Sequence, residues 1–284
     1  MNLSAKDTVG SKIRCLELSQ MVKNEPAILT KLVNLEKVFV PNDPTIIPCG
    51  RGNPEELIFS RKIAESFIEK LLDRNSGSKF TSYNDFKEKA EDWWLKHPKN
   101  ANTPNWDIAC IAEIHDRAGL ILVEAKAHKG EFSRKTKKPS SDSQNSQDNN
   151  TKIISEITRA SGEMKAKSKL NFNLNGNSPY QLSNRFAWSW FLAQNGIPVV
   201  LMYLGFIETK EMNRIRFESH DDVVLSVLSH CKGKKDDSII YVPDKAWQQE
   251  PLYDDGNTTL YSVIRSMELE IGQATIVSIN GLSV

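Results

Sequence analysis

Hydrophobic residues along the chain form two distinct patterns, a helical period and short runs that are apolar on both faces. The two longest β-rich runs, 106–114 and 119–127, are separated by a short polar segment that contains Gly119, a turn-forming residue. This arrangement predicts a β-hairpin. In the second run Glu124 and Lys126 share one face, because side chains alternate along a strand. Runs that are apolar on both faces are typical of strands covered on both sides.

Elsewhere, apolar residues at helical spacing predict helices before and after the hairpin. They are expected as two short helices within 11–40, then at 53–71, 83–96, 152–170, 180–194, 220–231 and 258–270. The helix at 53 is expected to begin with Asn53 as its cap and Pro54 at its first position. A buried strand is expected at 197–207 and a short one at 239–242. The alternation of strands and helices predicts an α/β fold.

A polar, low-complexity segment at about 129–151 interrupts these patterns directly after the hairpin. Its composition offers little to bury, so we expect a mobile loop over 134–150. The domain organisation expected from these features is an N-terminal helical extension at 1–48 and one α/β domain at 49–284 that contains the loop.

Composition adds limits to this picture. A chain of 284 residues with 39% hydrophobic residues and a formal net charge of +1 is typical of a globular protein. Basic residues are in excess over 129–169 and acidic residues over 211–284, which fits a local phosphate-facing surface or solvated loops. The four cysteines have no metal-binding spacing. We expect a cytoplasmic protein without a membrane segment, since there is no apolar leader and the run 197–207 is too short to span a bilayer.

The candidate chemistry lies in the hairpin, where Asp107, Glu124 and Lys126 occur in strands that are otherwise apolar. Charged residues are rarely buried unless they are paired or bind a metal. Two neighbouring carboxylates attract a hard divalent cation such as Mg²⁺. A lysine on the same face orients a water molecule or stabilises developing charge. The alternative is a solvated ion pair between Glu124 and Lys126 at the end of a hairpin.

Asp107, the hairpin and Glu124-Ala125-Lys126 resemble the PD-(D/E)xK nuclease superfamily, in a bacterial branch. The likeness extends over about 54–207 and includes V-E-A-K-A-H, Y-Q-L-S-N-R at 180–185 and the strand after it. One departure is that Trp106 precedes Asp107, where the motif has proline. The resemblance implies a restriction-endonuclease-like core, with a mixed β-sheet flanked by helices.

The resemblance also implies a function, a Mg²⁺- or Mn²⁺-dependent endonuclease that hydrolyses phosphodiester bonds in DNA. Asp107 and Glu124 would hold the metal, assisted by the backbone carbonyl of Ala125, and Lys126 would activate the attacking water. A helix that precedes the sheet often supplies a further acid in this superfamily, and Glu56 is the candidate. The alternative for Glu56 is a solvated position near a helix N-terminus.

Further residues are candidates for substrate binding. Gln181, Asn184 and Arg185 form the polar side of the first turns of a helix that is otherwise apolar, and the resemblance implies that it lies beside the metal site. Arginine binds phosphate in a bidentate manner, but a purely structural network explains these residues equally well. Arg134 and Lys135, in the polar segment, are expected to meet a phosphate backbone.

Two functions therefore remain open from the sequence. The first is the metal-dependent nuclease. The second is a non-catalytic nucleic-acid-binding or assembly module on the same fold, which the near-neutral charge and the lack of an assured third carboxylate favour.

Overall fold

The computed structural model describes residues 9–99, 103–131, 138–170, 173–231, 247, 250–272 and 275–280. The helices are α1 Gly10–Asn24, α2 Ala27–Val33, α3 Ile63–Arg74, α4 Tyr83–Trp94, α5 Gln144–Ser168, α6 Tyr180–Gln194 and α7 His220–Cys231. The strands are β1 Val38–Phe39, β2 Ile46–Ile47, β3 Leu57–Ile58, β4 Asn105–Trp106, β5 Ile108–Ile114, β6 Arg117–Lys126, β7 Val199–Phe206, β8 Tyr253–Asp254, β9 Thr259–Glu270 and β10 Thr275–Asn280. Two short 3₁₀-helices, η2 Lys129–Glu131 and η3 Lys210–Ile215, complete these elements.

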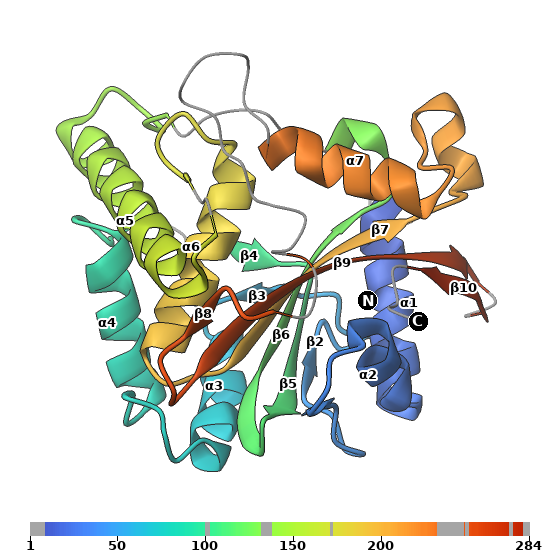
Figure 1. Ribbon diagram of the computed structural model, residues 1–284, viewed down its shortest axis with the longest axis horizontal. Helices are drawn as coiled ribbons and strands as arrows, with labels where there is room; N and C mark the ends of the chain where they lie inside the picture. Colours follow the sequence, from blue (N-terminus) through green and yellow to red (C-terminus); the bar gives the residue numbers. More distant parts are fainter. Residues whose placement is uncertain are drawn as a thin grey trace.

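A mixed β-sheet with the strand order β1-β5-β6-β7-β9-β10 forms the centre of the structure (Figure 1). The pairs β5–β6 and β9–β10 are antiparallel, whereas β6–β7 and β7–β9 are parallel. At the sides, β2 pairs with β5 and β8 with β9, and β3 and β4 form a separate two-stranded ribbon. The expected mixed sheet flanked by helices is therefore confirmed.

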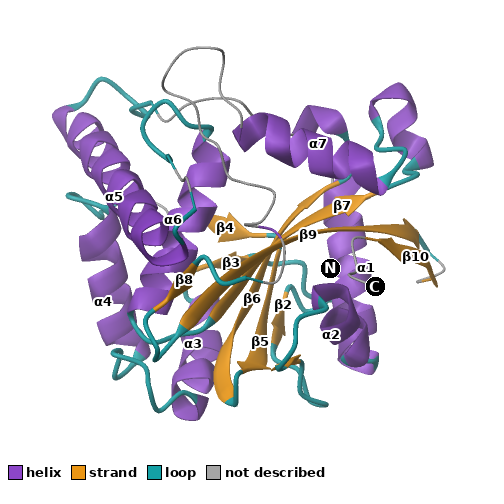
Figure 2. Cartoon of the chain, in the orientation of Figure 1, coloured by secondary structure: helices purple, strands orange, loops and turns teal. Residues whose placement is uncertain are grey.

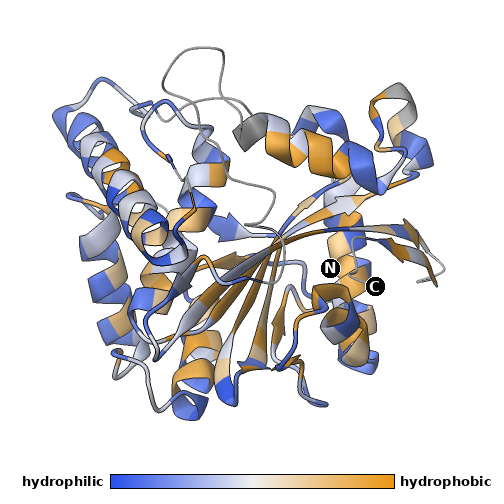
Figure 3. Ribbon diagram, in the orientation of Figure 1, coloured by the Kyte–Doolittle hydropathy of each residue, from blue (hydrophilic) through white to orange (hydrophobic). Residues whose placement is uncertain are grey.

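Helices cover both faces of this sheet (Figure 2). The apolar side chains of α1 and α2 pack on one face in one core cluster, and those of α3, α4, α5 and α6 pack on the other face in a second. Helix α7 contacts β7 and β9 and belongs to the second cluster. Figure 3 shows the strands in the middle as mainly hydrophobic. None of the helices that the structure describes is long and apolar enough to cross a membrane.

The two parallel neighbours β6 and β7 are the most deeply buried strands. Every residue of β7, and every residue of β6 from Gly119 onward, is buried. A strand in the middle of a sheet with helices on both faces has no solvated side, so its sequence is apolar throughout. The charged end of β6 therefore lies in the protein interior.

The turn of the β5–β6 hairpin is shorter than expected. His115 and Asp116 form it, with φ values of 50° and 61°, and β6 begins directly afterwards. Two successive residues with positive φ give the twist that a two-residue hairpin needs. Gly119 is not in the turn but in the strand, where a Cβ atom would lie 2.5 Å from the carbonyl oxygen of Pro198.

One expected helix begins later than predicted, and another is a strand. Residues from Asn53 onward do not begin a helix, because Leu57 and Ile58 form β3 and pair with Trp106 and Asn105 of β4. The helix starts only at Ile63. The pairing partner of β3 is β4, which is distant in the sequence, so no local pattern predicts that β3 is a strand.

The expected helix at 258–270 is the long strand β9. Its apolar residues Leu260, Val263, Ile264 and Met267 happen to have helical spacing. In the structure the even-numbered ones join one core cluster and the odd-numbered ones join the other. A strand that is buried on both faces does not alternate in polarity, so its period is not visible in the sequence.

The polar segment 129–151 is also not a loop throughout. Helix α5 begins at Gln144 and is capped by Ser143, whose hydroxyl accepts a hydrogen bond from the N–H of Ser146. The side chain of Asn149 accepts from the backbone N–H groups of Lys96 and His97 and donates to the carbonyl of His97. The polar residues thus bind the chain that follows α4, so the expectation of a mobile loop is wrong from Gln144 onward.

Two further expectations concern the ends of the sheet. The region expected as an N-terminal helical extension, 1–48, contains α1 and α2 and also β1 and β2, which both pair with β5. The short strand expected at 239–242 lies outside the described residues.

Candidate active site

Asp107 lies at the joint between β4 and β5, and its carboxylate reaches the edge of β6. The N–H of Ala125 donates to Oδ2 of Asp107 over 2.7 Å. The first residue of β5, Ile108, pairs with Val123, so β6 continues beyond the end of β5. The side chain of Asp107 therefore takes the place that a strand carbonyl would occupy.

Glu124 is buried in the interior, with 1% of its surface exposed. Its Oε1 atom accepts hydrogen bonds from Nζ of Lys126 and from Nε2 of Gln181, the latter over 2.5 Å. Its Oε2 atom accepts from Nε of Arg185 over 2.6 Å. One carboxylate thus has two cationic partners and one amide partner, which satisfies a buried charge.

The partners of Glu124 come from the first turns of α6. Gln181 and Arg185 are four residues apart and so lie on one side of the helix, facing β6. Asn184 accepts a hydrogen bond from Nη1 of Arg185 over 2.8 Å. The guanidinium of Arg185 also lies 4.9 Å from the ring centre of Trp106, close enough for a cation–π contact. The structure therefore brings all three predicted α6 residues together with Glu124.

The charges of the site shift the pKa of each group. Burial, and then the charge of Glu124, raise the pKa of Asp107 to about 7. Burial alone would also raise the pKa of Glu124, but the charges of Arg185 and Lys126 outweigh it and hold that pKa below its usual value. Burial acts to lower the pKa of Lys126, yet Glu124 and Asp107 together raise it. At neutral pH, Glu124 and Lys126 are therefore charged, and Asp107 is close to its midpoint.

A further acid, Glu131 of η2, was not predicted from the sequence. The N–H of Ala127 donates to its Oε2 atom over 2.5 Å, and Ser11 of α1 donates to its Oε1 atom over 3.2 Å. Its charge also raises the pKa of Lys126. Glu131 lay in the segment expected to be a loop, so its only signal was an acidic residue five positions after Lys126.

Two carboxylates therefore accept hydrogen bonds from alternate backbone N–H groups at the end of β6. Asp107 accepts from Ala125, and Glu131 accepts from Ala127. The N–H and the C=O of one strand residue point to the same edge. The carbonyl of Ala125 consequently faces the edge on which Asp107 lies, which is the position expected for an additional oxygen ligand.

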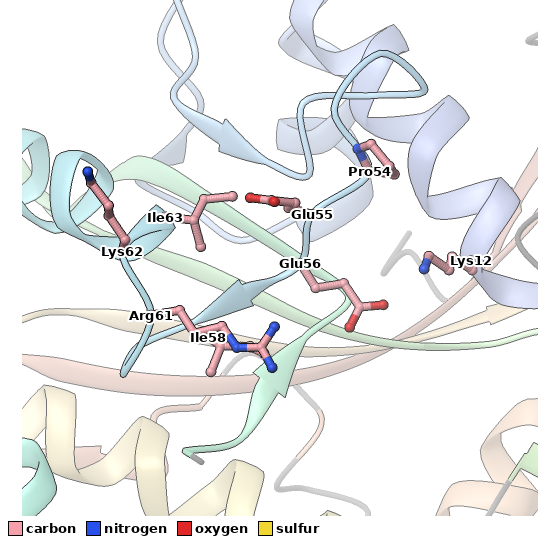
Figure 4. A pocket seen from close by; sticks show the side chains of 8 residues that line it. All are labelled: Lys12, Pro54, Glu55, Glu56, Ile58, Arg61, Lys62 and Ile63. Atoms are coloured by element: carbon pink, nitrogen blue, oxygen red, sulfur yellow. The ribbon is translucent and has the colours of Figure 1, made fainter. Parts of the chain in front are cut away.

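Glu56, the candidate third acid, precedes β3 and does not lie on a helix. Its carboxylate accepts a hydrogen bond from Nδ2 of Asn105 over 2.6 Å, and its charge contributes to the raised pKa of Asp107. It also lines a surface pocket beside the start of α3 (Figure 4). The expected position near a helix N-terminus is therefore wrong, although Glu56 is a neighbour of Asp107. Arg134 and Lys135 lie outside the described residues.

The donor atoms suit a magnesium-type ion only in part. Among the described residues, no group of three or more His, Cys, Asp or Glu side chains is arranged to hold a metal. Mg²⁺, however, is commonly held by one or two carboxylates together with water. Asp107 and the Ala125 carbonyl, with Glu124 near them, form such a set. The pKa of Asp107 is raised first by burial and then by the negative charge of Glu124, and a bound cation would favour the ionised form against both causes.

No protein-family model, curated protein or solved structure matches the chain. Inferences about its chemistry therefore depend on the geometry described above.

The pKa of Asp107 predicts how stability depends on pH in the metal-free protein. A carboxyl whose pKa is about 4 when unfolded and about 7 when folded contributes stability that is lost as the pH rises through that window. The slope attributable to Asp107 is about 1.4 kcal/mol per pH unit at most. We expect the free energy of unfolding to fall between pH values of about 5 and 7 relative to an Asp107→Asn variant.

Urea unfolding in the presence of EDTA measures this difference. Asparagine keeps an oxygen that accepts the Ala125 N–H, so the variant removes the titration and preserves the hydrogen bond. Above a pH of about 5, Glu124 stays ionised and does not add a slope of its own, because its pKa is lowered. Parallel stability curves for the two proteins would show that Asp107 is not a buried, titrating carboxyl.

The buried network also predicts a hierarchy of stability losses. Glu124→Gln leaves Lys126 and Arg185 without their shared carboxylate and should lower the free energy of unfolding by about 3 kcal/mol. Arg185→Met should cost less, because Lys126 still neutralises Glu124. Glu65→Gln, on the exposed side of α3, is the control and should change stability by less than about 0.5 kcal/mol. Chemical denaturation that gave equal losses for Glu124→Gln and the control would contradict a buried network.

Proposed function

We propose that the chain is a divalent-metal-dependent nuclease that hydrolyses phosphodiester bonds, with a restriction-endonuclease-like core. The observation that carries this proposal is the meeting of Asp107, Glu124 and Lys126 at the buried end of β6. Asp107, half-buried beside the buried Glu124, has a pKa raised to about 7, and strongly shifted carboxyl groups of this kind cluster at functional sites. The succession of two strands, two helices and a strand, here β5, β6, α5, α6 and β7, is the order that the family resemblance implies and supports the proposal.

Each residue has a role that follows from its position. Asp107 and Glu124 supply carboxylate oxygens, and the carbonyl of Ala125 faces the edge of Asp107. Lys126, charged and directed at Glu124, is placed to orient a water molecule and to stabilise negative charge that develops on phosphate. When bound, Mg²⁺ or Mn²⁺ would supply Lewis acidity and lower the pKa of a water molecule.

The residues of α6 fix the orientation of Glu124 before a substrate binds. Arg185 and Gln181 hold Glu124 in one orientation, and Asn184 and Trp106 in turn fix the guanidinium. Residues held in this way keep a site preorganised, which lowers the cost of reaching the reactive geometry. Arg185 is also a bidentate phosphate donor by chemistry, so a shift of its guanidinium from Glu124 to phosphate is part of the proposal.

The proposed substrate is nucleic acid, and DNA follows from the family resemblance. The site is built for a phosphodiester because it combines carboxylates for a metal with cations for phosphate oxygens.

A second candidate is a non-catalytic nucleic-acid-binding or assembly module on the same fold. The observation that favours it is that both oxygens of Glu124 already have protein partners. In this case the network is structural, and Glu124 has no oxygen to give to a metal without losing a donor. Mn²⁺ binding and cleavage distinguish the two candidates.

Lys126→Ala and Asp107→Ala should affect metal binding and cleavage in different ways. Lysine does not bind a cation, and its charge competes for Glu124, so Lys126→Ala should bind Mn²⁺ as tightly as the parent or more tightly. It should nevertheless lose about 3 kcal/mol of transition-state stabilisation, which is a rate loss of more than a hundredfold. Asp107→Ala should weaken Mn²⁺ binding directly, with part of the cleavage recovered at high Mn²⁺ concentration.

Calorimetric titration of Mn²⁺ and cleavage of plasmid, linear duplex and single-stranded DNA measure both effects. Lys70→Ala and Asp73→Ala, at exposed positions near the end of α3, are matched controls for the loss of each charge. Cleavage by Lys126→Ala at the parental rate would contradict the proposed mechanism. Nucleic-acid binding by a parent protein that neither takes up Mn²⁺ nor cleaves would establish the second candidate instead.

A further inference from the structure

A pocket of about 620 Å³ lies beside the candidate site, between α1, the segment that leads into β3 and the start of α3. Its charged lining consists of Lys12, Glu55, Glu56, Arg61 and Lys62. In Figure 4 the side chains of Arg61 and Glu56 extend into the same space, and Lys12 faces them from α1. The volume is within the range of small-ligand sites.

The side chains of two cations of the pocket have no hydrogen-bond or ion-pair partner among the described residues. They belong to Arg61 and Lys62, which are exposed and form hydrogen bonds through backbone atoms only, such as the carbonyl of Arg61 that accepts from the hydroxyl of Tyr83. The carboxylate of Glu56, by contrast, is bonded to the amide of Asn105. Unpaired cations in a concave site raise the local concentration of anions, and arginine presents a fork that matches phosphate.

Glu56 links the pocket to the candidate site. It lines the pocket, and its carboxylate accepts a hydrogen bond from Nδ2 of Asn105 over 2.6 Å. Asn105, the partner of Glu56, lies two residues before Asp107 in the chain. A ligand in the pocket is therefore a neighbour of whatever binds at Asp107.

We propose that this pocket binds a backbone phosphate of the nucleic-acid strand next to the phosphodiester at Asp107, with Arg61 as its main donor and Lys12 on the opposite wall. Lys62, whose side chain points away from Arg61 in Figure 4, adds positive charge beside the pocket. This inference rests on the proposed function for its choice of ligand. A polymer with regularly spaced phosphates that places one of them at Asp107 also places another nearby. Glu55 and Glu56 keep the pocket from a high positive charge, so a single phosphate suits it better than a multiply charged anion.

The test measures binding without cleavage. Fluorescence anisotropy in EDTA follows a short labelled single strand and the matching duplex across a salt series, with the parent and an Arg61→Gln/Lys62→Gln double variant. The double variant should bind about tenfold more weakly at moderate salt. Its slope of log affinity against log salt should be shallower by about 0.7 for the single strand and about 0.9 for the duplex, because one phosphate fewer is neutralised and fewer counterions are released.

A matched control is available on α3, the helix that follows Arg61 and Lys62. Lys70→Gln/Arg74→Gln removes one lysine and one arginine near the exposed C-terminal end of α3, with the same change in net charge. This control should keep the parental affinity and salt slope. Thermal unfolding of both double variants checks that they are folded, which is expected because all four side chains are exposed.

The outcomes separate this inference from the proposed function. Equal binding by the two double variants overturns the pocket assignment, and the cleavage assay still decides the nuclease. Loss of binding in Arg61→Gln/Lys62→Gln supports the pocket, whether or not the parent cleaves. Competition by inorganic phosphate or a mononucleotide at the same affinity as the strand would assign the pocket to free phosphate compounds and overturn a strand phosphate. A parent that binds neither the single strand nor the duplex overturns the pocket assignment, and the cleavage assay with Mn²⁺ still decides the nuclease.

Discussion

The buried carboxylate of Glu124 is the feature on which the rest of the site depends. An isolated ion in the interior is unstable by several kcal/mol, so the protein surrounds Glu124 with Lys126, Arg185 and Gln181. These partners come from β6 itself and from α6, which packs against the sheet. The position of α6 relative to β6 is therefore set by charge as well as by apolar packing. The same arrangement leaves Asp107 as the carboxyl whose ionisation the site does not fully balance.

The end of β6 shows a second constraint. The backbone N–H groups of β6 that follow Val123, the partner of Ile108 at the start of β5, need hydrogen-bond acceptors. Asp107 and Glu131 accept two of these groups, on Ala125 and Ala127. The acids thus stabilise an unpaired strand edge, and they also gather oxygen atoms there. Structural and catalytic interpretations share these contacts, and the response of the site to a cation is what separates them.

The sequence predicted the hairpin, the buried strand β7 and most helices, because each has a clear local period or an apolar run. It also assigned Glu124 and Lys126 to one face of the second strand, and their side chains contact each other in the structure. It failed at β9, where burial on both faces removed the alternation, and at β3, whose partner strand β4 is distant in the chain. The start of α5 was missed because its polar residues bind the chain after α4 and do not contribute to the core.

The contacts of the site were less predictable than its residues. Arg185 and Gln181 were expected near the metal, but their direct bonds to Glu124 depend on how α6 crosses β6, which no local pattern contains. Glu131 carried no periodic signal. Glu56 was assigned to a helix, yet it is a neighbour of Asp107 through the β3–β4 ribbon. Long-range pairing, more than local propensity, determines which of these acids meet.

The central claim is that the carboxylates at the end of β6 accept a divalent cation. Anomalous X-ray scattering from a crystal soaked in Mn²⁺ tests it most directly. We expect a manganese peak bonded to Asp107, Glu124 and the carbonyl of Ala125, with at least one donor displaced from Glu124. No peak at this site, with Lys126, Gln181 and Arg185 all still bonded to Glu124, would contradict it and identify the network as structural.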